Sequence, residues 1–188
     1  MRNRHGTRNR TRWRLPRRYD DGVKIRTAHL VYGGASRFEA RTGTGRTLVY
    51  GDVKSANELS PVETLVASLA ACSAMDVISI LVKKRQVVDN YVIEVDADQR
   101  DAFPQVLTRV ELVHVIEGSV VLEHAVRRAI ELSATKYCPI NAMISSGATE
   151  VHHRFRMRCT GIPNEAEGEV IVTGPFRPSD VLPGLAGA

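Results

Sequence analysis

The sequence predicts an α+β domain in which an antiparallel sheet packs on a central, buried helix. Two observations lead to this prediction: a long apolar helical run lies near the middle of the chain, and segments of alternating polarity lie before and after it. The third observation is length, because 188 residues hold one domain of ordinary size together with tails.

The central helix is expected within residues 59–84, and its start is strongly marked. Ser60 can cap the helix, Pro61 suits its first position, and Glu63 completes a capping box. Residues 66–74 are small and apolar on nearly all sides, which favours a buried helix. Polar and charged residues interrupt the run, so we do not expect it to span a membrane. Because one sheet of this size would leave part of the helix uncovered, we expect a homodimer that buries the other side.

Strands are expected on both sides of this helix. Before it, the expected strands are residues 23–32, 35–41 and 46–50. After it, strands are expected at residues 90–100 and 106–117, a helix at 120–134, a short helix at 139–146 and a last strand at 149–159. His114 falls on the apolar face of its strand, which is typical of a core histidine. His152 and His153 are neighbours on a strand and face opposite sides, so they make a poor metal site.

The folded domain is expected to span residues 23–160, between a tail of residues 1–22 and a Gly- and Pro-rich tail of residues 161–188. Within the second tail, residues 168–173 could add an edge strand. Residues 1–18 hold eight arginines and no acid, so the net charge of +5 comes from this segment and the rest of the chain is mildly acidic. We interpret the first tail as disordered and solvated, although such a tail could also bind nucleic acid through phosphate contacts.

Three cysteines without a CxxC pair indicate a protein of the reducing cytoplasm, without structural disulfides. Cys72 lies in the central helix, either as a small core residue or as a thiol at a packed seam. Cys138 precedes the helix that begins at Pro139, where the helix dipole and nearby Lys136 favour a thiolate. Two thiols at helix features suggest a redox pair formed in space. Cys159 continues the inward face of the last strand, so we interpret it as structural.

The two cysteine-containing blocks, with the order of elements around them, resemble those of a known family. Residues 60–77 read SPVETLVASLAACSAMDV, and residues 132–140 read LSATKYCPI. Together they resemble the OsmC/Ohr family of osmotically inducible and organic-hydroperoxide-resistance proteins, over roughly residues 24–159. The wording around both cysteines is most similar to the YhfA-like branch of that family.

The resemblance implies an OsmC-like fold, an intertwined homodimer and a site at the interface between the two subunits. In the peroxidase members, one cysteine attacks a hydroperoxide, a second cysteine resolves the product, and an arginine and a glutamate hold the reactive thiolate. By this resemblance, Cys72 takes the attacking role and Cys138 the resolving role. Arg37 is the more plausible arginine, with Arg26 as the weaker candidate.

The glutamate departs from the family pattern. Ohr-type sequences place it directly after the proline, where this chain has Val62, so Glu63 comes one residue late. On an ideal helix Glu63 also faces away from Cys72, which favours the capping role for its carboxylate. Asp76 lies one turn beyond Cys72 and is expected to be structural, because a carboxylate beside a thiol opposes thiolate formation.

The function implied by the resemblance is reduction of organic hydroperoxides by a pair of thiols, with an external dithiol restoring both. No metal or other cofactor is expected, and the expected partners are a second copy of the chain, the hydroperoxide and the reductant. Two other hypotheses stay open. The first is a non-catalytic protein of the same fold, which senses redox state or binds small apolar ligands; the displaced glutamate favours it. The second is a protein that associates with nucleic acid through its arginine tail.

Overall fold

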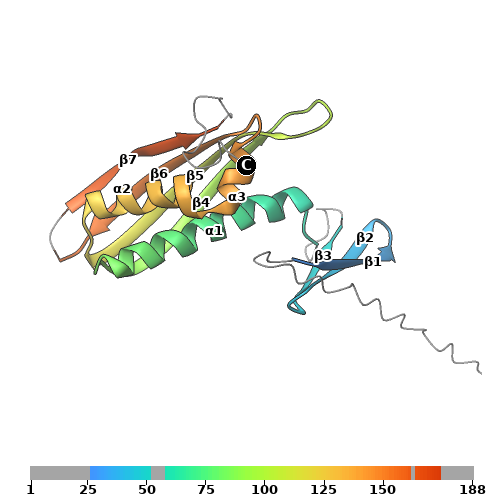
Figure 1. Cartoon of the computed structure of the whole chain (residues 1–188), viewed down its shortest axis with the longest axis horizontal. Coiled ribbons are helices and arrows are strands. Elements are labelled where there is room, and N and C mark those ends of the chain that lie inside the picture. The colour runs from blue at the N-terminus through green and yellow to red at the C-terminus, as the bar shows by residue number, and fades with distance from the viewer. Residues whose placement is uncertain (1–25, 52–57, 162–163, 175–188) are drawn as a thin grey trace, which may run out of the picture. The chain divides into compact units, whose positions relative to one another are not determined.

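The computed structural model describes residues 26–51, 58–161 and 164–174 (Figure 1). The chain divides into two compact units, Met1–Leu59 and Ser60–Ala188, and each unit is described by itself. The expected tail of residues 1–22 lies outside the described residues, as does the end of the chain after residue 174.

The first unit contains an antiparallel sheet of three strands in the order β1-β2-β3. Its strands are β1 (Ala28–Gly34), β2 (Arg37–Thr42) and β3 (Thr47–Tyr50). The turn between the first two strands is formed by Ala35 and Ser36, whose φ angles of 48° and 61° lie in the left-handed region that suits a tight hairpin. Just before the second unit, Leu59 forms a bridge beside Tyr50 of β3.

The second unit contains a sheet of four strands in the order β4-β5-β6-β7. They are β4 (Val87–Gln99), β5 (Leu107–Val120), β6 (Glu150–Cys159) and β7 (Asn164–Thr173). The prediction of a purely antiparallel sheet is wrong here, because β5 and β6 are parallel. Helices connect the end of β5 to the start of β6. This crossover carries the chain back to the end of the sheet at which β5 starts, so β6 runs in the same direction as β5.

The helical layer of this unit lies on one face of the sheet (Figure 1). It consists of α1 (Pro61–Lys83), α2 (Glu123–Leu132), a π-helical turn η1 (Ser133–Tyr137) and α3 (Pro139–Ser145). A main apolar cluster joins Val77 and Leu81 of α1 to α2 and to Phe155 of β6. A second cluster gathers around Leu69 at the N-terminal half of α1 and includes Cys138. The expected α+β architecture is therefore confirmed, in a mixed sheet.

The end of the folded domain lies later than residue 160. Strand β7 pairs with β6 along most of its length, from Cys159 opposite Asn164 to Val151 opposite Thr173. The expected edge strand at 168–173 is therefore present but begins four residues earlier. The sequence concealed this, because Gly168 interrupts the strand pattern. In the structure Gly168 has a positive φ of 156°, a conformation that residues with a Cβ rarely adopt, and it lies beside the Phe155 ring.

Helix α1 is buried along one face only. Leu69, Ser73, Val77 and Leu81 are fully buried, whereas Met75 is 72% exposed. This agrees with the expectation that one sheet leaves part of the helix uncovered, since the sheet and α2 cover only one side of α1 in the single chain. By length and composition α1 could also cross a membrane, with a mean hydropathy of 2.2. One such helix is weak evidence for a span, because core helices share these properties.

Candidate active site

Two thiols and a carboxylate meet in the second unit. The sulfur atoms of Cys72 and Cys138 and a carboxylate oxygen of Asp76 all lie within 4.8 Å of one another. Cys138 is buried, whereas Cys72 and Asp76 are half-buried. The three residues come from two separate parts of the chain, so the fold itself assembles this cluster, which we call the thiol–carboxylate cluster.

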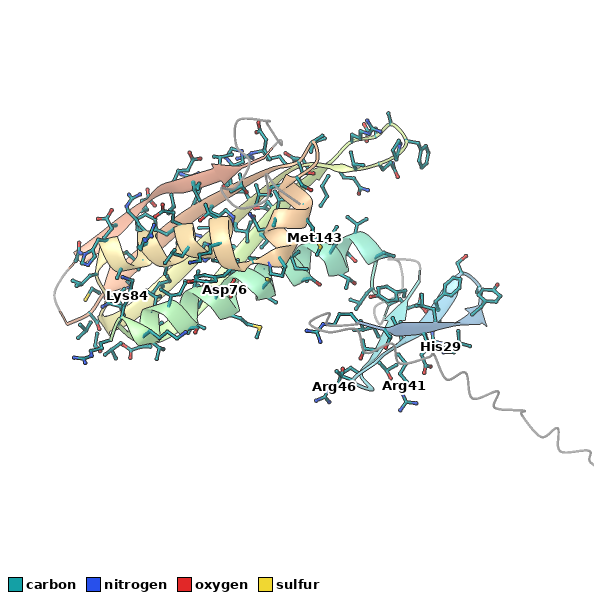
Figure 2. All side chains as sticks on the ribbon, in the orientation of Figure 1. His29, Arg41, Arg46, Asp76, Lys84 and Met143 are labelled. Atoms are coloured by element: carbon teal, nitrogen blue, oxygen red, sulfur yellow. The ribbon has the colours of Figure 1, made fainter. Side chains whose placement is uncertain are left out.

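Helix α1 supplies two of the three groups, with Asp76 one turn beyond Cys72. Asp76 is labelled on this helix in Figure 2. The start of this helix is fixed by a complete capping box, in which Ser60 Oγ accepts from the Val62 N–H at 3.2 Å and Glu63 accepts from the Ser60 N–H at 3.0 Å. Residues four apart on a helix share a face. Both side chains are therefore held on one rigid element.

The third group reaches the cluster through the π-helical turn η1 and the start of α3. Cys138 is the N-cap residue of α3, and its sulfur accepts from the Asn141 N–H at 3.3 Å. Its own N–H donates to the Ser133 carbonyl at 2.9 Å. The Ser133 hydroxyl donates to Asp76 Oδ2 at 3.2 Å, and Ser73 Oγ lies 3.3 Å from the Ser133 hydroxyl. Ser133 thus contacts two members of the cluster at once.

The electrostatics of Cys138 differ from the prediction. Burial, together with a hydrogen bond with Cys72, raises the pKa of Cys138 to about 12, although the Asn141 N–H opposes the shift. The expected thiolate at this helix start is wrong, because loss of water outweighs the dipole of a helix only seven residues long. Burial also raises the pKa of Asp76, and the Ser133 hydrogen bond partly offsets that rise. Cys138 therefore keeps its proton at neutral pH.

A buried polar chain extends from Cys138 toward the sheet. The Asn141 side-chain amide donates to the Ala134 carbonyl at 2.8 Å, and its Oδ1 lies 3.0 Å from His153 Nε2. His153 stacks on His114 with ring centroids 5.9 Å apart, and His114 Nδ1 lies 2.7 Å from the Tyr91 hydroxyl. Burial lowers the pKa of His114 to about 3 and that of His153 to about 4. The expectation of His114 as a core histidine is confirmed.

The other two predicted site residues are Glu63 and Arg37, and each has a partner of its own. The Glu63 carboxylate is engaged at the helix start, as the capping interpretation predicted. Arg37 belongs to the first unit, where its Nε lies 3.3 Å from a carboxylate oxygen of Glu58. The structure therefore brings together Cys72 and Cys138 of the predicted set, and it gives Arg37 a carboxylate partner that the sequence had not indicated.

Sequence reasoning indicated neither Asp76 as a member of the thiol–carboxylate cluster nor Glu58 as the partner of Arg37. Asp76 was interpreted as structural, although its four-residue spacing from Cys72 already placed both on one face. Glu58 lies in the loop before α1, and no periodicity relates it to Arg37. The bridge between Leu59 and Tyr50, together with the pairing of Tyr50 with Phe38, brings Glu58 beside β2.

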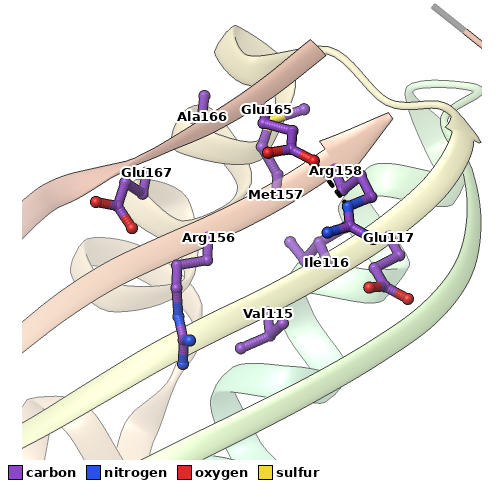
Figure 3. Close-up of a pocket in the computed structure, with 9 residues that line it drawn as sticks. All are labelled: Val115, Ile116, Glu117, Arg156, Met157, Arg158, Glu165, Ala166 and Glu167. Carbon is purple, nitrogen blue, oxygen red and sulfur yellow. Dashed lines mark hydrogen bonds and ion pairs between the residues drawn. The ribbon is translucent and has the colours of Figure 1, made fainter. Parts of the chain in front are cut away.

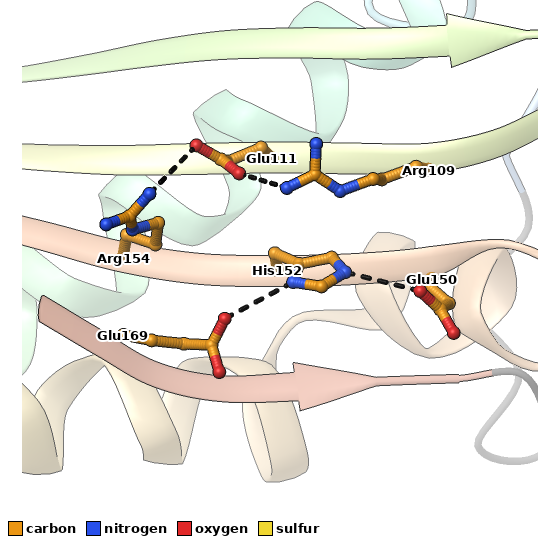
Figure 4. Close-up of polar contacts among 6 residues, drawn as sticks. All are labelled: Arg109, Glu111, Glu150, His152, Arg154 and Glu169. Atoms are coloured by element: carbon orange, nitrogen blue, oxygen red, sulfur yellow. Dashed lines mark hydrogen bonds and ion pairs between the residues drawn. The ribbon is translucent and has the colours of Figure 1, made fainter.

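The opposite face of the four-stranded sheet is covered by ion pairs. Glu111 pairs with Arg109 and, at 3.6 Å, with Arg154, and His152 lies 3.3 Å from both Glu150 and Glu169 (Figure 4). A shallow depression of about 440 Å³ lies on the same face, lined by residues that include Arg156, Arg158 and Glu165 (Figure 3). Both arginines already pair with glutamates. We therefore assign no site there.

Comparison with known proteins identifies relatives of the chain. The family model described as OsmC-like protein matches residues 54–154. Protein YhfA of Escherichia coli K12 is 34% identical over 93 residues, which is 50% of this chain and 69% of that protein.

Solved structures show the same fold. A hypothetical protein from Aquifex aeolicus VF5 superposes with a TM-score of 0.63 at 28% identity, over 72% of this chain and 99% of that one. An organic hydroperoxide resistance protein from Elizabethkingia anophelis superposes with a TM-score of 0.57 at 16% identity, over 75% of this chain and 100% of that one. At that identity the second likeness concerns the fold alone.

Proposed function

The chain belongs to the OsmC-like family, in the YhfA-like branch, and on this premise we propose that it is a thiol-dependent peroxidase that reduces organic hydroperoxides to alcohols. The observation that carries the proposal is the meeting of the Cys72 and Cys138 sulfurs within 4.8 Å of each other. Two thiols at this separation are close to the geometry from which a disulfide forms without rearrangement of the fold.

The two thiols differ in a way that assigns their roles. Cys138 is buried and keeps its proton, since its pKa is raised to about 12, so it is a poor first nucleophile. Cys72 is half-buried and therefore more accessible. We assign the attack on the peroxide to Cys72 and the resolving step to Cys138, which also donates a hydrogen bond to the Cys72 sulfur.

The reaction then runs in two balanced steps. The Cys72 thiolate attacks one peroxide oxygen, the O–O bond breaks, and the departing alkoxide takes a proton to become the alcohol. Cys72 is left as a sulfenic acid. The Cys138 thiol attacks that sulfur, forming the Cys72–Cys138 disulfide and releasing water. Two electrons have passed from the thiols to the peroxide, and an external dithiol restores both thiols by exchange.

Positive charge for the Cys72 thiolate comes, in this proposal, from Arg37. Its guanidinium is held by Glu58 at 3.3 Å, and a fixed arginine stabilises developing negative charge better than a mobile one. In this proposal Glu58 takes the place of the family glutamate, because the Glu63 carboxylate accepts from the Ser60 N–H at the helix start.

The working unit in this proposal is a homodimer. The outer face of α1 exposes apolar side chains, among them Leu65, Met75 and Val82, and burial of this stripe against a second copy would remove a large apolar area from water. An apolar surface beside the thiols favours organic hydroperoxides over hydrogen peroxide. The same proposal places the protein in a reducing cytoplasm, where both thiols persist.

One experiment tests the proposal directly. The reduced full-length protein is mixed with one equivalent of an organic hydroperoxide, the alcohol is measured, and the protein is digested without reductant for mass spectrometry. We expect one equivalent of alcohol and a peptide pair linked through Cys72 and Cys138. Linkage that is not followed by further alcohol production, when excess hydroperoxide and an external dithiol are then supplied, would instead support a redox sensor of the same fold. The absence of both linkage and alcohol would overturn the peroxidase proposal.

A further inference from the structure

The thiol–carboxylate cluster has the composition of a metal site. Two cysteines and one carboxylate supply three ligand atoms, all within 4.8 Å of one another. Thiolates bind soft and borderline cations such as Zn²⁺ and are poor ligands for Mg²⁺ and Ca²⁺. No metal was expected from the sequence, because the thiol chemistry implied by the resemblance requires none.

The arrangement of the ligands suits one ion. Cys72 and Asp76 lie one turn apart on α1, and Cys138 approaches from the start of α3. Zinc–sulfur and zinc–oxygen bonds of about 2.3 and 2.1 Å would hold ligand atoms somewhat closer together than the 4.8 Å limit observed here. The three ligand atoms are therefore close enough to reach one ion with only small side-chain adjustments. Three protein ligands leave the fourth position of a tetrahedral ion open.

The groups around the cluster are those that orient metal ligands. The Ser133 hydroxyl donates to Asp76 Oδ2 at 3.2 Å, which fixes the carboxylate. The Ser133 carbonyl accepts from the Cys138 N–H at 2.9 Å, and the Asn141 N–H donates to the Cys138 sulfur at 3.3 Å. Outer partners of this kind hold first ligands in place in established metal sites.

We propose that Cys72, Asp76 and Cys138 bind one zinc-class divalent cation per chain when both thiols are reduced. The cation displaces the proton of each thiol, so two thiolates and one carboxylate ligate it. Oxidation of the two cysteines to a disulfide removes two of the three ligands and releases the ion. The inference uses the same cysteines as the proposed peroxidase, but it requires no peroxide and adds a role for Asp76.

The test uses Co²⁺ as a spectroscopic substitute for Zn²⁺ on the full-length protein, kept reduced by a phosphine that lacks thiols. We expect one Co²⁺ per chain, a thiolate-to-cobalt charge-transfer band, the visible bands of a tetrahedral site, and displacement of the cobalt by Zn²⁺. Binding without the thiolate band, or none at all, would overturn the proposal. Both results are read from the wild-type protein, so they do not depend on any variant folding.

Matched variants locate the ligands. Asp76→Ala should weaken binding by at least the 10- to 100-fold that loss of an outer partner typically costs, and Ser133→Ala should weaken it by about tenfold. Asp96→Ala, at an exposed carboxylate of β4, and Cys159→Ser should leave the affinity unchanged. Equal affinity in Asp76→Ala and Asp96→Ala would contradict the three-ligand site.

The metal and peroxidase proposals fail separately. Protein whose Cys72–Cys138 disulfide has been formed with a chemical oxidant should not bind Co²⁺, and reduction should restore binding. Retention of the full cobalt spectrum by the oxidised protein would overturn the metal proposal and leave the peroxidase proposal untouched. A chain that binds Co²⁺ through both thiols but never consumes peroxide would overturn the peroxidase proposal and leave the metal proposal untouched.

Discussion

The backbone N–H of Asn141 donates to the sulfur of Cys138 at 3.3 Å, and the side chain of the same asparagine lies 3.0 Å from His153. One residue therefore joins the Cys138 thiol to the buried histidines of the sheet. The N–H opposes the rise in the pKa of Cys138, but the effect of burial is larger, so this thiol is protonated at neutral pH. The first prediction follows from that difference between the two thiols.

Substitution of each cysteine should have a distinct effect. We expect Cys72→Ser to abolish peroxide consumption and Cys138→Ser to permit a single turnover, which leaves a sulfenic acid at Cys72 because the resolving thiol is gone. A dimedone-type probe with mass spectrometry detects that acid. Cys159→Ser is the matched control, since its side chain is buried in β6 away from the cluster. Wild-type turnover in Cys72→Ser would refute the assigned roles.

Removal of the Arg37 guanidinium should slow the attack on peroxide. We expect Arg37→Ala to lower the rate of sulfenic acid formation at neutral pH on the order of 10²-fold, because a fixed charge that stabilises the reacting anion is lost. Glu58→Gln should have a smaller effect in the same direction, since it loosens Arg37 without removing its charge. Arg41→Ala, on the same strand (Figure 2), is the control. Stopped-flow kinetics with equal rates in the Arg37 and Arg41 variants would contradict the role of Arg37.

A charge on the exposed face of α1 should separate the two subunits. Met75 is 72% exposed in the single chain, and we expect a dimer interface of about 1,600 Å² or more over this face. Met75→Glu would bury an unpaired carboxylate there, so it should shift the protein toward monomer. Light scattering at micromolar concentration measures the shift. Val92→Glu is the control, because it adds the same charge to β4 at a position that is 45% exposed; it should leave the mass of the assembly unchanged. A wild-type protein that is monomeric at this concentration would contradict the proposed dimer.

Acid should destabilise the fold through His114 and His153. Burial, with a further contribution from the neighbouring histidine, holds their pKa values near 3 and 4, below the unfolded value of about 6.5. The unfolded chain therefore binds protons first as the pH falls. Stability should be complete above about pH 6.5 and should decline below it by up to about 1.4 kcal/mol per pH unit for each histidine.

Chemical denaturation from pH 7.5 to 4.5 measures this decline. His114→Gln should make it shallower, because one of the two buried groups no longer takes up a proton on unfolding. His124→Gln, at an exposed position of α2, is the matched control. An equal change of slope in both variants would show that burial of His114 is not the cause.

The sequence predicted local features well because they depend on neighbours in the chain. The capping box of Ser60 and Glu63 and the alternation along β5 were both expected, and both are present. The parallel pairing of β5 with β6 was not expected, because alternation is the same in parallel and antiparallel strands. The pairing of Arg37 with Glu58 depends on a bridge across the first sheet, which no local pattern records.

The prediction for Cys138 was wrong for a related reason. A helix start is visible in the sequence, but burial of the thiol is set by packing against distant residues such as Leu69. The larger physical effect was therefore the one that the sequence could not show. The position of Cys72 in the central helix, by contrast, is confirmed, because both the helix and its start signal are local.

The π-helical turn η1 contains five residues, 133–137, and the number of residues in this segment sets the direction in which Cys138 leaves it. Each residue of a helix turns the chain by about 100°, so deletion of one residue here would convert the wide turn toward an ordinary helix and swing the Cys138 sulfur away from Cys72. Point substitutions at exposed positions of the turn do not change the number of residues, so they leave the orientation of Cys138 unchanged. The segment should therefore tolerate changes of side chain far better than insertions or deletions of even one residue.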